Sequence, residues 1–259
     1  MKMKKRKVCI VVTARPSYAR IKSVMSAINQ RNDLELQLVV AASALLERYG
    51  SAVNYMKEDG FNPQAMVYMV LEGENLVTAA KSTGLGIVEL ATVFDNLNPD
   101  IVISVADRYE TIATAIASSY SNIPLAHVQG GEVTGSIDEK VRHAVTKLSD
   151  IHFVTNDDSF KRVKKMGEEE DKIHVTGNTV IDALLQMSEK IKRDATLNDS
   201  LKEKFSFLDL KKKLILPTTE QFQTRQMILL RVAVCVLAVG LGSASPPDFW
   251  PRFVGSHDA

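Results

Sequence analysis

The sequence predicts an α/β fold, a doubly wound parallel sheet, and three observations support this. Short apolar runs alternate with amphipathic segments of helical periodicity from residue 7 to residue 190. The apolar runs are hydrophobic on both faces, as strands are when helices cover both sides of a parallel sheet. Each connection is long enough to hold the crossover helix that parallel neighbours need. The pattern does not set the order of the strands.

A first group of elements extends from residue 7 to residue 94. Continuous or alternating apolar residues predict strands at residues 7–13, 34–41 and 65–70. Apolar residues at helical spacing predict helices at residues 17–29, 44–57 (one helix or two) and 75–94. Gly84 and Gly86 are positions where the last of these helices could bend.

A second group begins after Pro99. Strands are predicted at residues 101–105, 125–128, 151–154 and 173–176. Helices are predicted at residues 108–120, 138–148, 158–166 and 180–190. The alternation stops there, so residues 1–193 are expected to form one domain.

The rest of the chain has a different character. Residues 194–216 are polar and charged at first and then begin an apolar run, as expected for a linker and the start of a second domain. Residues 217–259 show no alternation, and we expect an atypical tail rather than a native domain. Its apolar core at 227–242 contains Arg231 and is shorter than the ~20 apolar residues of a membrane span, which argues against a membrane role.

Composition narrows the class of protein. The chain has 259 residues, 45% of them hydrophobic and 24% charged, with a net charge of +1, which is ordinary for a soluble globular protein and gives no reason to expect a nucleic-acid partner. The basic residues at 2–7 precede too short an apolar run for a signal peptide. Cys9 and Cys235 show no pairing logic, so a cytoplasmic location is expected.

The stretch from residue 127 to residue 147 concentrates reactive side chains around glycines. Gly130 and Gly131 end an apolar strand and project Glu132 at its carboxyl end, where open α/β sheets bind ligands. Asp138 and Arg142 follow at i, i+4 spacing on one helix face, where they form either an ion pair that holds the acid or a plain surface salt bridge. His143 could face the same cleft.

Two other loops follow predicted strands. Arg15 and Arg20 flank a strand-to-helix junction without glycine, where their guanidinium groups could bind phosphate. The alternative is that Ser17 caps the helix and Arg15 is solvated. Asp107 follows the strand at 101–105 and is either a helix cap or a cap with a catalytic role.

Three further residue types have simpler interpretations. His127 lies inside an apolar strand and is expected to be a core histidine rather than a catalyst. Asn178 is expected to cap the helix that follows it. Neither HxxxH nor CxxC spacing occurs, so no metal site is expected.

Four segments together resemble the UDP-N-acetylglucosamine 2-epimerases, and within them the hydrolysing branch that makes N-acetylmannosamine for sialic-acid-type sugars. The segments are TARPSYARIK at 13–22, ADRYE at 106–110, HVQGGEVTGSIDEKVRHAVTKLSDIHFVTN at 127–156 and KIHVTGNTVIDAL at 172–184. The resemblance covers residues 6–216, and the third segment is the most specific. It implies two Rossmann-like domains facing a cleft, as in GT-B glycosyltransferases, of which this chain matches the first.

The resemblance also implies a reaction and a set of site residues. UDP is eliminated across C1–C2 of the sugar to give a glycal, and water then adds with inverted stereochemistry at C2. Asp107, Glu132 and Asp138 match the family's carboxylates, and which is acid and which is base stays open. Arg15, Arg20, Arg142 and His143 match its substrate-binding positions, with Arg20 where many relatives carry lysine.

The resemblance implies a UDP-sugar substrate, no cofactor and a homodimer. After residue 216 relatives continue into a second domain that grips the uridine diphosphate, whereas residues 217–259 do not resemble it. A truncated or replaced C-terminal half is therefore expected to impair turnover. Two alternatives remain open: a non-catalytic remnant that serves as an interaction module, and a GT-B-type enzyme that uses another nucleotide sugar.

Overall fold

The structure is a computed structural model, and it describes residues 4–73, 75–105, 108–134 and 137–206. The chain divides into two compact units, Met1–Val180 and Ile181–Ala259. The expected boundaries at residues 193 and 216 stay predictions, and the expected tail at 217–259 lies outside the described residues.

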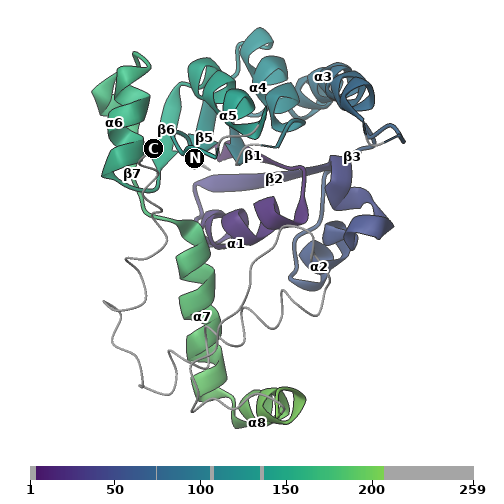
Figure 1. Cartoon of the computed structure of the whole chain (residues 1–259), viewed down its shortest axis with the longest axis vertical. Helices are drawn as coiled ribbons and strands as arrows, with labels where there is room; N and C mark the ends of the chain where they lie inside the picture. Colours follow the sequence, from purple (N-terminus) through teal and green to yellow (C-terminus); the bar gives the residue numbers. More distant parts are fainter. Residues whose placement is uncertain (1–3, 74, 106–107, 135–136, 207–259) are drawn as a thin grey trace, which may run out of the picture. The chain divides into compact units, whose positions relative to one another are not determined.

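The first unit contains a seven-stranded sheet with the strand order β3-β2-β1-β4-β5-β6-β7 (Figure 1). The strands are β1 (Arg6–Val12), β2 (Leu34–Ala41), β3 (Ala65–Val67), β4 (Ile101–Val105), β5 (Leu125–Val128), β6 (Ile151–Val154) and β7 (Ile173–Val175). Every neighbouring pair is parallel. The predicted α/β class and the parallel, doubly wound sheet are confirmed, and each predicted apolar run is a strand.

Helices connect the strands at the predicted places. They are α1 (Arg15–Asn29), η1 (Ala42–Leu45), η2 (Glu47–Tyr49), α2 (Ala52–Glu58), α3 (Leu76–Leu97), α4 (Thr111–Tyr120), α5 (Ile137–Leu148), α6 (Asp157–Lys165), η3 (Glu170–Lys172), α7 (Thr179–Arg193) and α8 (Ala195–Lys204). The helix predicted from residue 108 begins only at Thr111. Residues 108–110 form a turn instead, closed by a hydrogen bond from the Thr111 N–H to the Arg108 carbonyl at 2.8 Å.

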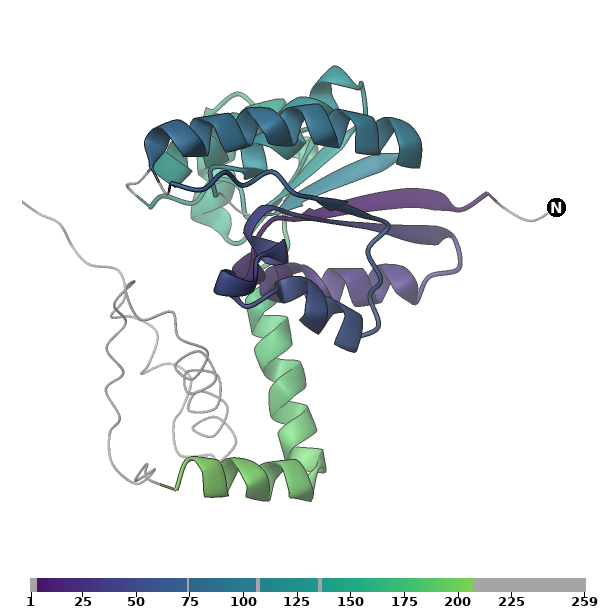
Figure 2. The ribbon, with the colours of Figure 1, turned by 90° about the vertical axis from the view of Figure 1, so that its right-hand side faces the viewer.

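Two apolar layers sandwich the sheet. Ile10 and Val12 of β1 face α1 and α2 on one side, whereas Cys9 and Val11 face the layer that contains α3 and α4 on the other. Figure 2 shows α1 and α3 on opposite faces of the sheet. Cys9 has no exposed surface, and burial raises the pKa of its thiol to about 12.

The long helix α3 continues without interruption through both of its glycines. A Cβ on Gly86 would lie 2.4 Å from the Met69 side chain and 3.0 Å from the Cβ of Ala113, so Gly86 lets α3 approach α4 closely. With a mean hydropathy of 1.3, α3 is the one helix among the described residues long and apolar enough to span a membrane by composition, which is weak evidence by itself; 17% of its apolar window is buried. Its residues Leu90 and Phe94 are fully buried in the sheet's apolar layer.

Candidate functional site

The strand order locates the expected ligand-binding edge of the sheet. The chain moves outward from β1 to β2 and β3, then returns to place β4 on the other side of β1. The carboxyl ends of β1 and β4 therefore flank the topological switch point, where open α/β sheets bind ligands. Arg15 follows β1 directly, and Arg108 follows β4.

The backbone of the turn after β5 is in a strained conformation that favours glycine. Gln129 and Gly131 have φ angles of 68° and 79°, in the left-handed region. A Cβ on Gly131 would lie 2.7 Å from the backbone oxygen of Ser159 in α6, and one on Gly130 would lie 3.0 Å from the His127 ring. The glycines thus press the turn against α6 and β5, and the chain leaves this contact at Glu132.

Arginine side chains from two helices hold the carbonyl groups of this turn. Arg142 of α5 is only 3% exposed and donates from Nη1 to the Glu132 carbonyl at 2.7 Å. Arg162 of α6 donates from Nη1 to the Gly131 carbonyl. The backbone N–H of Gln129 donates to the Phe153 carbonyl at 2.8 Å. Three elements therefore fix the backbone that carries Glu132.

The Glu132 carboxylate itself is held by its own partners. The Thr155 hydroxyl, at the end of β6, donates to Glu132 Oε1 at 3.0 Å. Burial lowers the pKa of Arg20, and the negative charge of Glu132 partly offsets that effect. Burial and repulsion by Arg20 lower the pKa of Arg142. The Arg20 guanidinium and the Thr155 hydroxyl thus lie near a half-buried carboxylate.

Asp138 lies on the other side of this edge, near the segment that follows β4. Burial has the largest effect on the pKa of both Arg108 and Glu110, and the charge of Asp138 adds a smaller upward effect to each, so the three groups are electrostatic neighbours. Glu110 is 1% exposed; its Oε1 accepts from Arg108 Nε at 2.9 Å. Burial is the largest cause that raises the pKa of the Glu110 carboxyl, and Arg108 opposes it. Asp107, the third predicted carboxylate, lies outside the described residues.

The loop between β1 and α1 does not have the helix cap that one interpretation of the sequence gives it. The N-cap of α1 is Ala14, without a side-chain hydrogen bond, and Ser17 is buried inside the helix, so Ser17 is not the cap. Arg15 places its guanidinium carbon 5.1 Å from the centre of the Tyr55 ring. Arg20 is anchored through its carbonyl, which accepts from the Thr179 hydroxyl.

The two predicted histidines have different environments. His127 is fully buried with Nδ1 3.1 Å from the Thr146 hydroxyl, as expected of a core histidine. His143 lies in α5 with Nε2 3.8 Å from Glu139 Oε1, and its buried Nδ1 has no hydrogen-bond partner among the residues that the structure describes. No group of three His, Cys, Asp or Glu side chains in the described part of the chain could hold a metal ion.

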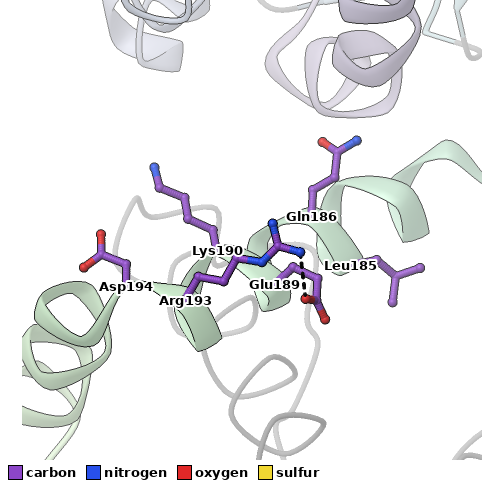
Figure 3. A pocket seen from close by; sticks show the side chains of 6 residues that line it. All are labelled: Leu185, Gln186, Glu189, Lys190, Arg193 and Asp194. Atoms are coloured by element: carbon purple, nitrogen blue, oxygen red, sulfur yellow. Dashed lines mark ion pairs between the residues drawn. The ribbon is translucent and has the colours of Figure 1, made fainter.

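One surface pocket lies in the second unit, and another lies beside the carboxyl edge of the sheet in the first unit. The larger, about 570 Å³, lies along α7 and is lined by Leu185, Gln186, Glu189, Lys190, Arg193 and Asp194 (Figure 3). Arg193 reaches back to Glu189, one turn earlier on the same helix, at 3.7 Å. The second, about 430 Å³, lies in the first unit beside Arg108 and Tyr109. Only this second pocket borders the carboxyl edge of the sheet.

Several supporting residues were missed from the sequence. Thr155 follows β6 directly, and its position at a carboxyl strand end is a signal that could have singled it out. Arg162 and Glu110 give no such signal, because their roles depend on how helices cross the turn. Asn178 was expected only as a cap. It does accept from the Val180 N–H at 3.0 Å, and it also accepts from the Gln129 side chain at 3.1 Å, which ties β7 to the β5 turn.

The chain is similar to known epimerases along most of its length. The family model for UDP-N-acetylglucosamine 2-epimerase matches residues 26–219. The UDP-N,N'-diacetylbacillosamine 2-epimerase (hydrolyzing) of Legionella pneumophila is 35% identical over 70% of this chain and 48% of that protein. The GDP/UDP-N,N'-diacetylbacillosamine 2-epimerase (hydrolyzing) of Campylobacter jejuni is 30% identical over 74% of this chain and 50% of that protein. The chain thus spans about half the length of the curated relatives it matches.

A solved structure agrees with the fold. The UDP-GlcNAc 2-epimerase of Neisseria meningitidis, crystallised with UDP-GlcNAc, matches with a TM-score of 0.67 and 23% identity over 78% of this chain and 55% of that one. At that identity the match establishes one Rossmann-like half of a GT-B-type architecture. Because the family model matches residues 26–219, the chain belongs to the UDP-N-acetylglucosamine 2-epimerase family.

Proposed function

We propose that this chain supplies the sugar-processing half of a hydrolysing UDP-N-acetylglucosamine 2-epimerase, which converts its substrate to N-acetylmannosamine and UDP. The observation that carries the proposal is the braced carboxylate of Glu132, fixed at a strand end by Thr155 and by a turn that Arg142 and Arg162 hold in place. A side chain on the surface for solubility alone needs no such support.

The proposed reaction begins with cleavage of the bond from C1 to the diphosphate oxygen, whose electron pair leaves with UDP. The positive charge that develops at C1 is stabilised electrostatically by carboxylates held in fixed positions. A carboxylate takes the C2 proton, and the electron pair of that C–H bond forms the C1=C2 double bond of the glycal. Water then adds its oxygen to C1 while an acid returns a proton to the opposite face of C2.

Glu132 and Asp138 are the described carboxylates that we assign to this chemistry, with Asp107 as the third. Arg20 lies close enough to Glu132 to offset its charge, so it is suited to hold the sugar or the departing phosphate near that carboxylate. Arg15 follows β1 at the switch point and is assigned to the substrate. Arg142 reaches the Glu132 carbonyl, so it supports the turn beneath the substrate.

His143 is assigned to the substrate as well. Its imidazole is partly exposed on the helix that follows the Glu132 turn, a position suited to contact with the sugar. We assign the acetamido sugar to this half and the uridine diphosphate chiefly to a second half, so turnover requires both. The relatives' printed names include both N-acetylglucosamine and diacetylbacillosamine substrates, and among these we propose the N-acetylglucosamine form in a sialic-acid-type route.

We also propose a homodimer in the cytoplasm. The helix α3 supports the homodimer, because it exposes four apolar side chains: Leu76, Val77, Leu85 and Val88. Such an apolar helix face is a suitable contact for a second copy.

The test is an assay of UDP and N-acetylmannosamine release from UDP-N-acetylglucosamine, monitored by chromatography. We expect release from a full-length version in which residues 1–216 continue into a family second domain. The chain as given should release little. If the full-length version folds but releases neither product, the chain is instead a non-catalytic remnant. If free UDP appears only when a sugar acceptor is added, the protein is a glycosyl transferase.

A further inference from the structure

A cluster of three titratable side chains lies in the amino-terminal half of β6, away from the carboxyl edge of the sheet. His152, the second residue of β6, is 1% exposed. Its Nε2 lies 3.3 Å from Glu168 Oε2, and Glu168 Oε1 accepts from Lys147 Nζ at 2.5 Å. We call these three residues the His152 cluster. The proposed reaction uses none of them.

The His152 cluster joins the ends of two helices. Lys147 is in the last turn of α5, and Glu168 lies just after the end of α6. Lys147 Nζ also donates to the Met166 carbonyl at 3.2 Å, so one ammonium group binds both backbone and side chain of the segment after α6. The same two helices carry Arg142 and Arg162, which hold the turn after β5. The cluster therefore ties together the helices that support that turn.

The geometry favours a neutral imidazole. Because Nε2 of His152 faces a carboxylate, it is the nitrogen that carries the hydrogen. A second proton would go to Nδ1, which is buried and has no hydrogen-bond partner in the part of the chain that the structure describes. Glu168 already has the ammonium of Lys147 as its counter-charge, so a charged ring would give the cluster a net positive charge. Burying such a charge is costly.

The strands on either side of His152 give it a largely apolar setting. Its register partner in β7 is Ile173, and its register partner in β5 is His127, whose Nδ1 lies 3.1 Å from the Thr146 hydroxyl. Asp150, just before β6, is the second acid near the ring. Its carboxylate accepts from the Leu125 N–H at 2.8 Å, which directs that oxygen towards the backbone of β5.

The balance of these effects follows from their sizes. Burial has the largest effect on the pKa of His152 and lowers it below the ordinary value of 6.5. Glu168 and Asp150 oppose that effect, and Lys147 adds to it. The folded state therefore binds the proton of His152 less tightly than the unfolded chain does.

We propose that the His152 cluster is a proton-sensitive latch between α5 and α6, closed while His152 is neutral and weakened when His152 takes up a proton. Opening admits water to Nδ1 and to the charged ring, so acid favours the open form. Since the folded-state pKa is lowered, the stability that the latch supplies is fully present above pH 6.5 and is lost as the pH falls below it. The latch concerns local opening alone, so its failure and the failure of the proposed epimerase are separate outcomes.

The test is hydrogen exchange of the full chain, measured by mass spectrometry for wild type and His152→Gln. Glutamine keeps an N–H donor for Glu168 but does not titrate. Comparison of the two proteins at the same pH cancels the intrinsic pH dependence of exchange. In the last turns of α5 and α6, the ratio of wild-type to variant exchange rates should rise between about pH 7.5 and about pH 5.5. The upper limit is about tenfold, for a histidine of ordinary pKa 6.5 that is charged only in the open form.

The matched control is His174→Gln, which removes an exposed histidine of the neighbouring strand β7. Its ratio of wild-type to variant exchange rates should not change with pH. A ratio for His152→Gln that stays constant or falls on acidification would overturn the proposal. An equal rise for His174→Gln would show a general effect of acid and would overturn it too.

A second variant keeps the test decisive if His152→Gln does not fold. Lys147→Gln removes a half-exposed ammonium group and leaves Glu168 free to act as counter-charge for a protonated His152. Acid should then open α5 and α6 less, so the ratio of wild-type to Lys147→Gln exchange rates should again rise on acidification. Lys161→Gln, on the exposed face of α6, is its control and should show no such rise. The same pH dependence in wild type and Lys147→Gln would refute the latch.

Discussion

The segments after β5 and β4 both present acidic side chains at the carboxyl edge of the sheet, but they support them differently. After β5, three elements hold the backbone, and the Glu132 carboxylate reaches the surface with one hydroxyl partner. After β4, the Glu110 carboxyl is buried and the arginine that it holds faces outward. The first arrangement presents a fixed anion and the second a fixed cation. After β5, the arginine that supports the backbone is buried and the Glu132 carboxylate is accessible. After β4, the Glu110 carboxyl is buried and its partner, Arg108, is accessible.

The largest expected effect concerns the half-buried carboxylate of Glu132. In the full-length version, Glu132→Gln should lower kcat by about 10³-fold with little change in melting temperature, because a fixed charge opposite the developing cation is lost. Asp138→Asn should behave alike. Stopped assays of UDP release measure both. The control Asp158→Asn alters an exposed carboxylate on α6. Unchanged kcat in both site variants would refute the carboxylate assignment.

The next prediction tests the support beneath Glu132. Gly131→Ala should cost about 3 kcal/mol of unfolding free energy, because the new Cβ meets the Ser159 backbone at a positive φ. Urea denaturation of the chain measures it. Gly84→Ala is the matched control: nothing lies within 4 Å of its Cβ, and an alanine inside α3 should stabilise the chain by about 0.5–1 kcal/mol. If Gly131→Ala lowers the unfolding free energy by less than an ordinary surface substitution does, the turn is not packed tightly against α6.

A smaller effect is expected where the Glu132 side chain is positioned. Thr155→Val should reduce kcat/KM about tenfold in the full-length version, since it removes a hydrogen bond to a charged group. Thr155→Ser should restore kcat/KM. A serine variant as poor as valine would indicate a packing role instead.

The smallest effect concerns the buried acid after β4. The pKa of Glu110 is raised in the folded chain, so the folded state binds its proton more tightly than the unfolded state does. Its contribution to stability is fully present below the unfolded value near 4.5 and is lost as pH rises towards the folded value. The stability of the wild type relative to Glu110→Gln should therefore fall as the pH rises above 4.5. Denaturation at several pH values measures the difference; an increase with pH would contradict the assignment.

The sequence sufficed for the strands but not for the contacts among loops. Apolar runs such as residues 101–105 predict strands because burial on both faces leaves no polar alternation. Their order could not be predicted, since periodicity holds no information about neighbours. The proximity of Asp138 to Arg108 follows only from that order, because β5 lies beside β4. The turn at 108–110 was also missed: Glu110 turns inward to Arg108, and helical spacing does not reveal it.

The burial of Cys9 in the central strand also provides a kinetic probe. A thiol without exposed surface and with a pKa of about 12 is almost entirely protonated and inaccessible at neutral pH. In a Cys235→Ser background, an alkylating reagent can reach this sulfur only when the centre of the sheet opens. The rate of alkylation therefore reports how often β1 separates from its neighbours in the native chain, without any denaturant.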